Sequence, residues 1–258
     1  MSKNLFTLLI AFIMCLASCS FVSKDFDTTD KDNLIIQLIT YVLDQAHFLD
    51  KEINDEFSEK VFDTFLENLD PYKRYFYASD IEEFSKYKFL IDDAFKNPNL
   101  DFFELVYNRY NKRMLESEKI FNDILSKPFD FNKDEVCECD FEELDYVKSK
   151  DQLFDRWRKL LKIYVIENYH NEIEDDLRKS KEDPDFTLRS PSSIEKKTRE
   201  TLKETMQQNY TFITDELQRS DWFSVYINSF VSQYDPNTSY LDPESKDRFD
   251  VDMSGNYA

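Results

Sequence analysis

The sequence predicts an all-α fold, a multi-helix domain of about eight helices, and two features of its composition carry that prediction. A single glycine occurs among 258 residues, which rules out Gly-rich phosphate loops and disfavours tight β-hairpins. Aromatic residues make up 16% of the chain and charged residues 33%, interleaved as in helices with one apolar stripe and one solvated face. No stretch alternates as a half-buried strand does. P-loop NTPases and Rossmann dehydrogenases are therefore excluded.

The first residues form a targeting segment. Lys3 precedes a mostly apolar run from Leu5 to Leu16, which is too short to cross a bilayer comfortably and is typical of a signal peptide. Leu16-Ala17-Ser18-Cys19 resembles a bacterial lipobox. We therefore expect residues 1–18 to be a lipoprotein signal peptide, Cys19 to be lipidated and residues 19–31 to form a tether. An ordinary signal peptide with an incidental cysteine is the alternative.

A lipid anchor would hold the protein at a membrane surface without spanning it. No later stretch is long and apolar enough to span a bilayer. We therefore expect a lipid-anchored protein of the bacterial cell envelope that faces the periplasm. Ser20 follows the cysteine in place of the Asp of the proteobacterial inner-membrane retention signal, which favours the outer membrane.

The chain is strongly acidic, with a formal net charge of −20 at pH 7. Such a field repels nucleic acid, so we expect no nucleic-acid partner. Basic patches on other proteins are the natural electrostatic match. Solubility alone is a sufficient reason for the charge.

Capping residues and prolines mark the helices of the first half. Asp55 is the expected N-cap of the second helix, and Asp70-Pro71 stops that helix. Ser79-Asp80-Ile81-Glu82 has the pattern of a capping box and opens the third. The first helix is expected to bury a face of Leu34, Ile35, Leu38, Ile39, Val42, Leu43 and Ala46. These signals predict helices over residues 32–50, 56–69, 79–96 and 101–127.

The second half begins with an acidic connection, residues 128–149. The long helix that follows has a dense apolar face in its first half and a charged second half, which we expect to project or fray. Asp183-Pro184 ends it, and Ser190-Pro191 caps the next. A weak shift in composition near residues 183–190 suggests two lobes rather than two independent domains. The predicted helices cover residues 150–181 and 191–219, one stretch around Trp222 and one from Pro243.

The chain has few residues that could form a metal site. It contains two histidines, and Glu167-x-x-His170 has the i, i+3 spacing of di-iron carboxylate bundles. Such a site needs two more inward-facing glutamates, and His170 lies in the charged half of its helix. Exposed helical residues are the simpler interpretation. We predict no metal and no cofactor.

Two further spacings carry little chemistry. Ser193-Ile194-Glu195-Lys196 matches the Ser-x-x-Lys of penicillin-recognising enzymes, but the other motifs of those enzymes are missing and serine is common at a helix start. Cys137-x-Cys139 lacks the two further ligands that a zinc site needs. We favour an incidental or locally bonded cysteine pair, and we predict no catalytic residue in this chain.

Four aromatic residues gather where the second helix stops. Tyr72, Tyr75, Phe76 and Tyr77 flank two bases, a composition that suits a contact with another protein. Packing of the bend onto its own helices is the alternative.

The most patterned run lies near the end of the chain. Asp235-Pro236-Asn237-Thr238-Ser239-Tyr240-Leu241 resembles the segment before the PDZ domain of carboxy-terminal processing (tail-specific) serine proteases, usually Asp-Pro-His-Thr/Ser-x-Tyr-Leu. Asp235, Pro236, Thr238, Tyr240 and Leu241 match that motif, whereas Asn237 departs from its histidine. Weaker matches lie upstream, over Asp55–Phe62, Ala78–Phe84 and Lys127–Phe131, in the same order as in that family. The resemblance covers residues 34 to 254.

In that family the order is signal, helical domain, PDZ domain and a protease domain with a Ser–Lys dyad. The resemblance implies that residues 32–258 are the N-terminal helical domain and that the PDZ and protease parts lie downstream, in cis or in trans. The expected role is a non-catalytic scaffold of a lipid-anchored envelope protease that binds envelope protein substrates or adaptor lipoproteins. A stand-alone helical lipoprotein that binds envelope proteins without catalysis is the alternative.

Overall fold

The structure is a computed structural model that describes residues 28–46 and 51–254. It is 72% helical, and the described residues form no strand, only an isolated bridge between Tyr77 and Val147. The all-α prediction is confirmed. The elements are α2 (Thr28–Ala46), α3 (Asp55–Leu69), α4 (Ala78–Phe84), η1 (Ser85–Tyr87), α5 (Ile91–Lys96), α6 (Asp101–Leu125), α7 (Lys150–Glu182), α8 (Pro191–Thr211), η2 (Phe212–Glu216), α9 (Arg219–Tyr234) and α10 (Pro243–Ser254).

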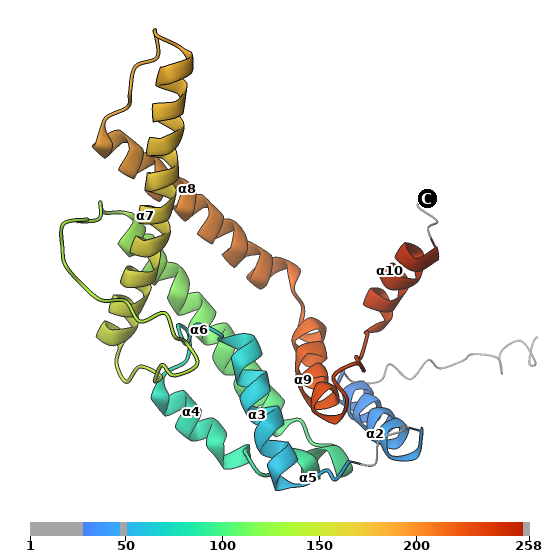
Figure 1. The fold of residues 1–258 in the computed structure, drawn as a ribbon. Helices are drawn as coiled ribbons and strands as arrows, with labels where there is room; N and C mark the ends of the chain where they lie inside the picture. The colour runs from blue at the N-terminus through green and yellow to red at the C-terminus, as the bar shows by residue number, and fades with distance from the viewer. Residues whose placement is uncertain (1–27, 47–50, 255–258) are drawn as a thin grey trace, which may run out of the picture.

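The body of the molecule is built around α3, which packs against α9 and α5 (Figure 1). Its apolar residues recur every three or four positions, so one face of the helix is buried from Phe57 to Leu69. The core is dense in aromatic rings because these helices meet through phenylalanine and tyrosine. Phe95 of α5 stacks on Phe230 of α9 with 3.5 Å between ring centroids. The body is thus closed by elements that lie far apart in the sequence.

Helices α7 and α8 run side by side and carry an arm away from the body (Figure 1). At 1.5 Å per residue, the 33 residues of α7 make a helix about 50 Å long. Its first half buries Leu153, Trp157, Leu161 and Val165. We call residues 166–197 the arm: the outer part of α7, the connection at the tip and the start of α8. The charged second half of α7 is helical to Glu182 and projects, as the sequence predicted.

The second helix begins at Asp55, because Asn54 and not Asp55 is its N-cap. The Asn54 side chain accepts the backbone N–H of Phe57 at 3.1 Å. The third begins at Ala78, where Asp80 accepts the N–H of the N-cap residue Tyr77 at 2.9 Å. The prediction of Asp55 and Ser79 as first capping residues was therefore wrong by one or two positions.

The predicted helix over 79–96 is instead two helices, α4 and α5, joined by the η1 turn. The cause is a buried contact with a distant helix. Ser58 of α3 donates to the carboxylate of Asp92 at 2.7 Å and accepts the Asp92 backbone N–H at 2.8 Å. This exchange places α5 on α3.

The predicted helix over 191–219 ends early as well. It leaves the α-helical form after Thr211, continues as the π-helical turn η2 and stops at Leu217, whose backbone is extended. Asp221 then accepts the backbone N–H of Gln218 at 2.7 Å and starts α9. The capping bond of the following helix explains the break.

The predicted buried face of α2 is also partly wrong. The helix buries Asp32, Ile36 and Leu43, whereas Leu34, Leu38 and Val42 are 46%, 55% and 52% exposed. An ion pair between Asp32 and Arg219 of α9, 2.5 Å long, turns the Asp32 side toward the body. Residues 47–50, also predicted as helix, lie outside the described residues.

Candidate functional site

The bend after α3 is organised by one buried carboxylate. Asp70 is 1% exposed and accepts the backbone N–H groups of Arg74 at 2.8 Å and of Tyr75 and Phe76 at 2.9 Å. Burial raises the pKa of the Asp70 carboxyl, and these N–H donors work against that rise. Lys73 takes a left-handed backbone conformation, with φ of 44°. The sharp turn after α3 is therefore made without glycine, because the Asp70 carboxylate accepts the backbone N–H groups of the bend.

Three of the four aromatic residues predicted as a protein contact lie inside the molecule. Tyr75, Phe76 and Tyr77 are 6%, 0% and 7% exposed, and Tyr72 is 37% exposed. Tyr75 lies edge-on to Tyr110 and Trp157, and Phe76 to Phe84. The bend packs onto its own helices, so within the described surface Tyr72 is the member of the four that a partner could reach. Its role in a contact stays a prediction.

The motif turn Asp235–Leu241 is held by side-chain hydrogen bonds to its own backbone and to α9. Asp235 accepts the hydroxyl of Thr238 at 2.8 Å and the backbone N–H of Asn237 at 3.0 Å. Asn228 of α9 accepts the Tyr240 N–H at 2.7 Å and donates to the Tyr240 carbonyl at 3.0 Å. The side chains of Asp235 and Thr238, and of Asn228 on the Tyr240 backbone, therefore fix the path of the chain between two helices.

The same turn leads directly into α10. Asp242 accepts the Ser245 backbone N–H at 3.0 Å and the Ser245 hydroxyl at 2.6 Å, ahead of Pro243 in the first turn. Asn237 replaces the histidine of the usual motif and still donates to Asp235, at 3.3 Å. Leu241 is 43% exposed. These hydrogen bonds fix the orientation in which α10 begins, and the side chains that form them are engaged in capping and turn contacts.

The residues considered for catalysis lie on the surface. The Ser193 backbone N–H is capped by Ser190 at 3.2 Å, and Lys196 faces Glu200 at 3.8 Å. His170 faces Glu174, with 3.3 Å between Nε2 and the carboxylate. Among residues 28–46 and 51–254, no group of three or more His, Cys, Asp or Glu side chains is arranged to hold a metal. These contacts are those of ordinary helix surfaces.

The cysteine pair lies in the 133–148 segment that covers the base of α7. Both thiols are free, with Cys139 exposed and Cys137 half-buried. Burial raises the pKa of the Cys137 thiol, and the neighbouring Cys139 adds to the rise. The nearby Glu135 is held by Arg158 and, at 2.7 Å, by Lys162. The segment is thus pinned to α7 beside the thiols. The Cys137 and Cys139 thiols donate to the backbone carbonyls of Glu138 and Cys137, at 3.8 and 3.7 Å.

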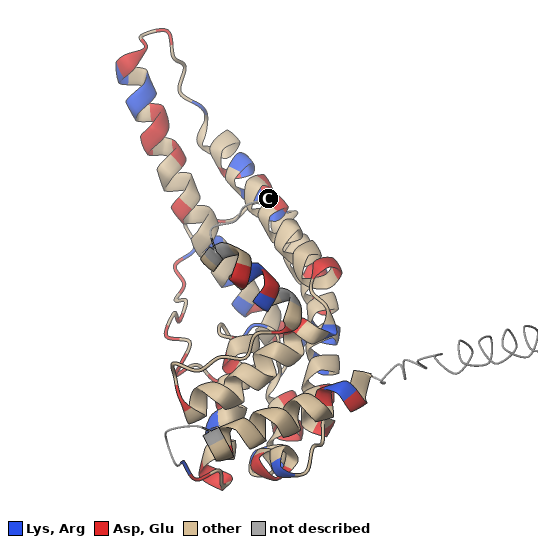
Figure 2. Cartoon of the chain, turned by 90° about the vertical axis from the view of Figure 1, so that its right-hand side faces the viewer, with Lys and Arg blue, Asp and Glu red and all other residues tan. Residues whose placement is uncertain are grey.

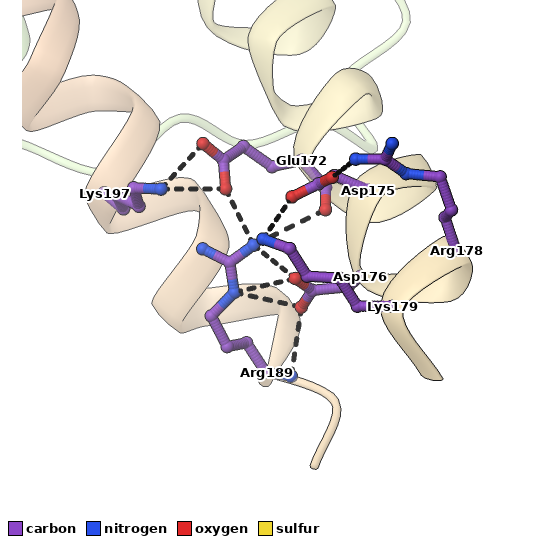
Figure 3. A network of polar contacts seen from close by, with 7 residues as sticks. All are labelled: Glu172, Asp175, Asp176, Arg178, Lys179, Arg189 and Lys197. Atoms are coloured by element: carbon purple, nitrogen blue, oxygen red, sulfur yellow. Dashed lines mark hydrogen bonds and ion pairs between the residues drawn. The ribbon is translucent and has the colours of Figure 1, made fainter. Parts of the chain in front are cut away.

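Sequence reasoning missed the ion-pair network of the arm (Figure 3). Arg189, from the connection at the tip, contacts Asp176 of α7 at 2.9 Å and Glu172 at 2.7 Å. Lys197 of α8 reaches Glu172 at 2.8 Å. The Asp175 pairs with Arg178 and Lys179 have helical i, i+3 and i, i+4 spacing and were visible in the sequence. The contacts of Arg189 join the start of α8 to α7, and they could not be predicted from the spacing of residues along one helix.

The surface of the arm carries both signs of charge, as Figure 2 shows.

Asp80 and Arg219 form two further networks within the body. Asp80, fully buried, binds Arg109 and Arg113 of α6, and Arg219 of α9 binds Asp32 and Glu104. Opposite charges thus tie α4 to α6 and α9 to α2 and α6. Within the described residues, no helix is both long enough and apolar enough to cross a membrane.

Comparison with known proteins finds one matching family and a similar protein. The family model described as tail specific protease N-terminal domain matches residues 39–244, a range that includes the bend and the motif turn. The chain is also similar to the tail-specific protease of Haemophilus influenzae, with 26% identity over 230 residues. That match covers 88% of this chain and 30% of the relative. The chain therefore spans less than a third of the length of that protein.

Proposed function

The chain belongs to the tail-specific protease N-terminal domain family, and we propose that it is the non-catalytic helical part of a lipid-anchored tail-specific serine protease of the bacterial cell envelope. In this proposal residues 1–18 are the signal peptide, residues 19–31 the tether from a lipidated Cys19, and residues 32–258 the helical domain. The family match over 39–244 is the observation that carries the proposal.

Its role is that of a scaffold that presents envelope proteins or adaptor lipoproteins to the protease. Two structural features support this role. The arm projects from the body and is held by ion pairs between its two helices. The motif turn is fixed at both ends and sets the direction of α10, from which a downstream PDZ domain would follow. The acidic body favours partners with basic surfaces.

The test is the mass of the endogenous protein, with its lipid, isolated from native envelopes. A species far heavier than 31.1 kDa that contains these peptides supports a helical domain joined in cis to PDZ and protease domains. A species near that mass, less the signal peptide and plus acyl chains, supports the stand-alone helical lipoprotein, with the protease absent or supplied in trans.

The anchor and the absence of catalysis are tested separately. Replacing Cys19 with serine should release the protein from the membrane fraction, whereas replacing Cys139 should not. The purified chain should leave an unfolded protein substrate intact over hours. Cleavage that persists through purification and is lost on replacement of a serine of this chain would contradict the non-catalytic role.

A further inference from the structure

A cavity of 250 Å³ lies where α6, α7 and α8 meet the bend and the η2 turn. Its floor is apolar and buried, because Met114, Phe121 and Trp157 are each 1–2% exposed. Its rim includes Met206, Ile213 and Phe212, and Phe212 is 56% exposed. A large exposed aromatic at the mouth of an apolar cavity is typical of a binding site rather than of a packing defect.

The charged residue in the lining of this cavity is Arg74, and no carboxylate lines it. The Arg74 guanidinium lies over the rings of Trp157, Tyr72 and Tyr75, at 4.8, 5.0 and 5.2 Å from their centroids. Its Nε atom is buried and has no hydrogen-bond partner. Within the described residues Arg74 forms no ion pair, unlike the arginines of the body networks. A buried donor without an acceptor is uncommon in proteins and points to a missing partner.

The nearest acid does not supply that partner. Asp70 attracts Arg74 electrostatically, but its oxygens accept the backbone N–H groups of the bend. The guanidinium is therefore held in place by aromatic rings, beside the Tyr75 hydroxyl, while its Nε–H has no acceptor. Arginine in this setting favours a planar, bidentate anion such as a carboxylate.

Three larger cavities beside the 133–148 segment differ in their charge. Each is lined by both carboxylates and bases, for example Asp155 with Lys159, Glu135 with Lys162, and Glu142 with Lys73. Of these four cavities in the described part of a chain of net charge −20, the Arg74 cavity is the one with a base and no acid in its wall. An anion in this cavity meets a base in the wall and no carboxylate there.

The size of the cavity limits the ligand. Pockets for drug-sized molecules have volumes of about 300–1,000 Å³, so 250 Å³ fits one amino-acid side chain with its carboxylate or an acid of a few carbons. The rim is formed partly by η2, and π-helical turns occur frequently at functional sites. Burial raises the pKa of the Tyr75 phenol, so this wall residue stays a neutral hydroxyl.

We propose that this cavity binds a small apolar carboxylate, with the carboxylate on Arg74 and the apolar group on Met114, Phe121 and Trp157. This chemistry is shared by the carboxyl end of a polypeptide with an apolar last residue and by a free short-chain acid. The inference stands on the cavity itself, so it does not depend on the proposed role in a protease.

The test uses Trp157 as its own reporter. The chain has two tryptophans, so a Trp222→Phe background leaves Trp157 alone. N-acetyl-leucine and hexanoate should each change its fluorescence saturably, and N-acetyl-leucinamide and hexanol should bind at least tenfold more weakly. A tetrapeptide ending in leucine that binds tighter than hexanoate identifies the polypeptide end as the source, and the reverse order identifies the free acid.

Variants separate a site from a general effect. Arg74→Gln should weaken N-acetyl-leucine at least tenfold, whereas Arg178→Gln, on the exposed arm, should leave binding unchanged. Ile213→Phe narrows the cavity with Arg74 in place and should weaken binding of N-acetyl-leucine similarly. If Arg74→Gln unfolds, this second variant tests whether the ligand binds in the cavity. Equal binding of acid and amide, or no saturation up to about 10 mM, would overturn the proposal.

Discussion

The indole Nε1 of Trp157 donates a hydrogen bond of 2.8 Å to the backbone carbonyl of Arg74, 83 residues earlier in the chain. The bond ties the base of α7 to the bend after α3. Both partners are buried or half-buried, and Arg156 reinforces the same connection by donating to the Lys73 carbonyl at 2.5 Å. Two side-chain hydrogen bonds therefore join the base of α7 to the bend.

Replacing Trp157 with phenylalanine should lower the free energy of unfolding by about 2–3 kcal/mol. The substitution removes this hydrogen bond, leaves a buried carbonyl without its donor and opens space in the core. Trp222→Phe is the matched control, because Trp222 is only partly buried and should cost less than half as much. Urea denaturation measures both, and equal losses in the two variants would contradict the importance of this contact.

Asp80 should make stability depend on pH in the acid range. Burial raises the pKa of its carboxyl, but hydrogen bonds from Arg113, the Tyr77 backbone N–H and Arg109 outweigh burial and hold the pKa below the ordinary 3.8. A lowered pKa in the folded state stabilises the protein above the unfolded-state pKa, and this contribution is lost as pH falls through the folded-state pKa.

Asp80→Asn should therefore cost about 3 kcal/mol at pH 7 and show a flatter decline in stability below pH 3.8. Arg109 and Arg113 keep their charge but lose the negative charge of Asp80 and one of its two acceptor oxygens, which explains the size of the loss. Asp134→Asn, an exposed aspartate of the 133–148 segment, is the control and should follow the native pH profile. An unchanged slope in Asp80→Asn would show that other groups dominate acid unfolding.

Asn228→Ala should loosen the motif turn without unfolding the body. The side chain forms two hydrogen bonds to the Tyr240 backbone, at 2.7 and 3.0 Å, and alanine leaves both backbone groups unpaired. We expect amides of residues 235–254 to exchange at least tenfold faster while those of α3 are unaffected. Ser224→Ala, one turn earlier on α9, is the control, because Ser224 is half-buried and its hydroxyl donates to the Ser220 carbonyl of the same helix. Uniform acceleration throughout the chain would indicate global destabilisation instead.

Arg189→Gln should act on the arm alone. Arg189 joins the tip to α7 through Asp176 and Glu172, so its loss frees the ends of both helices. Hydrogen exchange over residues 170–197 should rise at least tenfold, and the unfolding midpoint of the body should stay within error. Lys196→Gln removes a single exposed pair of 3.8 Å and should change neither measurement. Protection that survives in Arg189→Gln would show that packing of Ile194 holds the arm without the ion pairs.

The helical architecture was predictable from local signals. Periodic apolar residues and the prolines at 71, 128, 184, 191 and 243 mark where helices end or begin, and α6 and α7 match their predicted ranges closely. The breaks after Phe84 and Thr211 were not predictable, because Ser58 and Asp221 cause them by bonding to neighbouring elements. The orientation of α2 likewise depends on Arg219, far away in the sequence.

The candidate sites also differ in whether local sequence patterns or contacts between distant segments define them. The motif turn was found from its residue pattern, because Asp-Pro steps and an Asx-type acceptor act on nearby backbone. The aromatic cluster was found as well, but burial of Tyr75, Phe76 and Tyr77 arises from packing against α6 and α7. The Arg74 cavity brings together residues from four separate segments, and no spacing along the chain reveals it.

The pairing of α3 with α9 also fixes the order in which the molecule can be assembled. Asn68 bonds to Ser229, 161 residues later, whereas the arm is a hairpin of consecutive helices. At a synthesis rate of about 5–20 residues per second, α3 waits roughly 8–32 s for the helix that covers it. During that interval Phe57 and Phe65 lack the rings of Phe230 and Tyr226 of α9 that cover them in the folded protein. The high contact order of the body thus makes the nascent chain a client for chaperones, and nonsense products that end before α9 should aggregate.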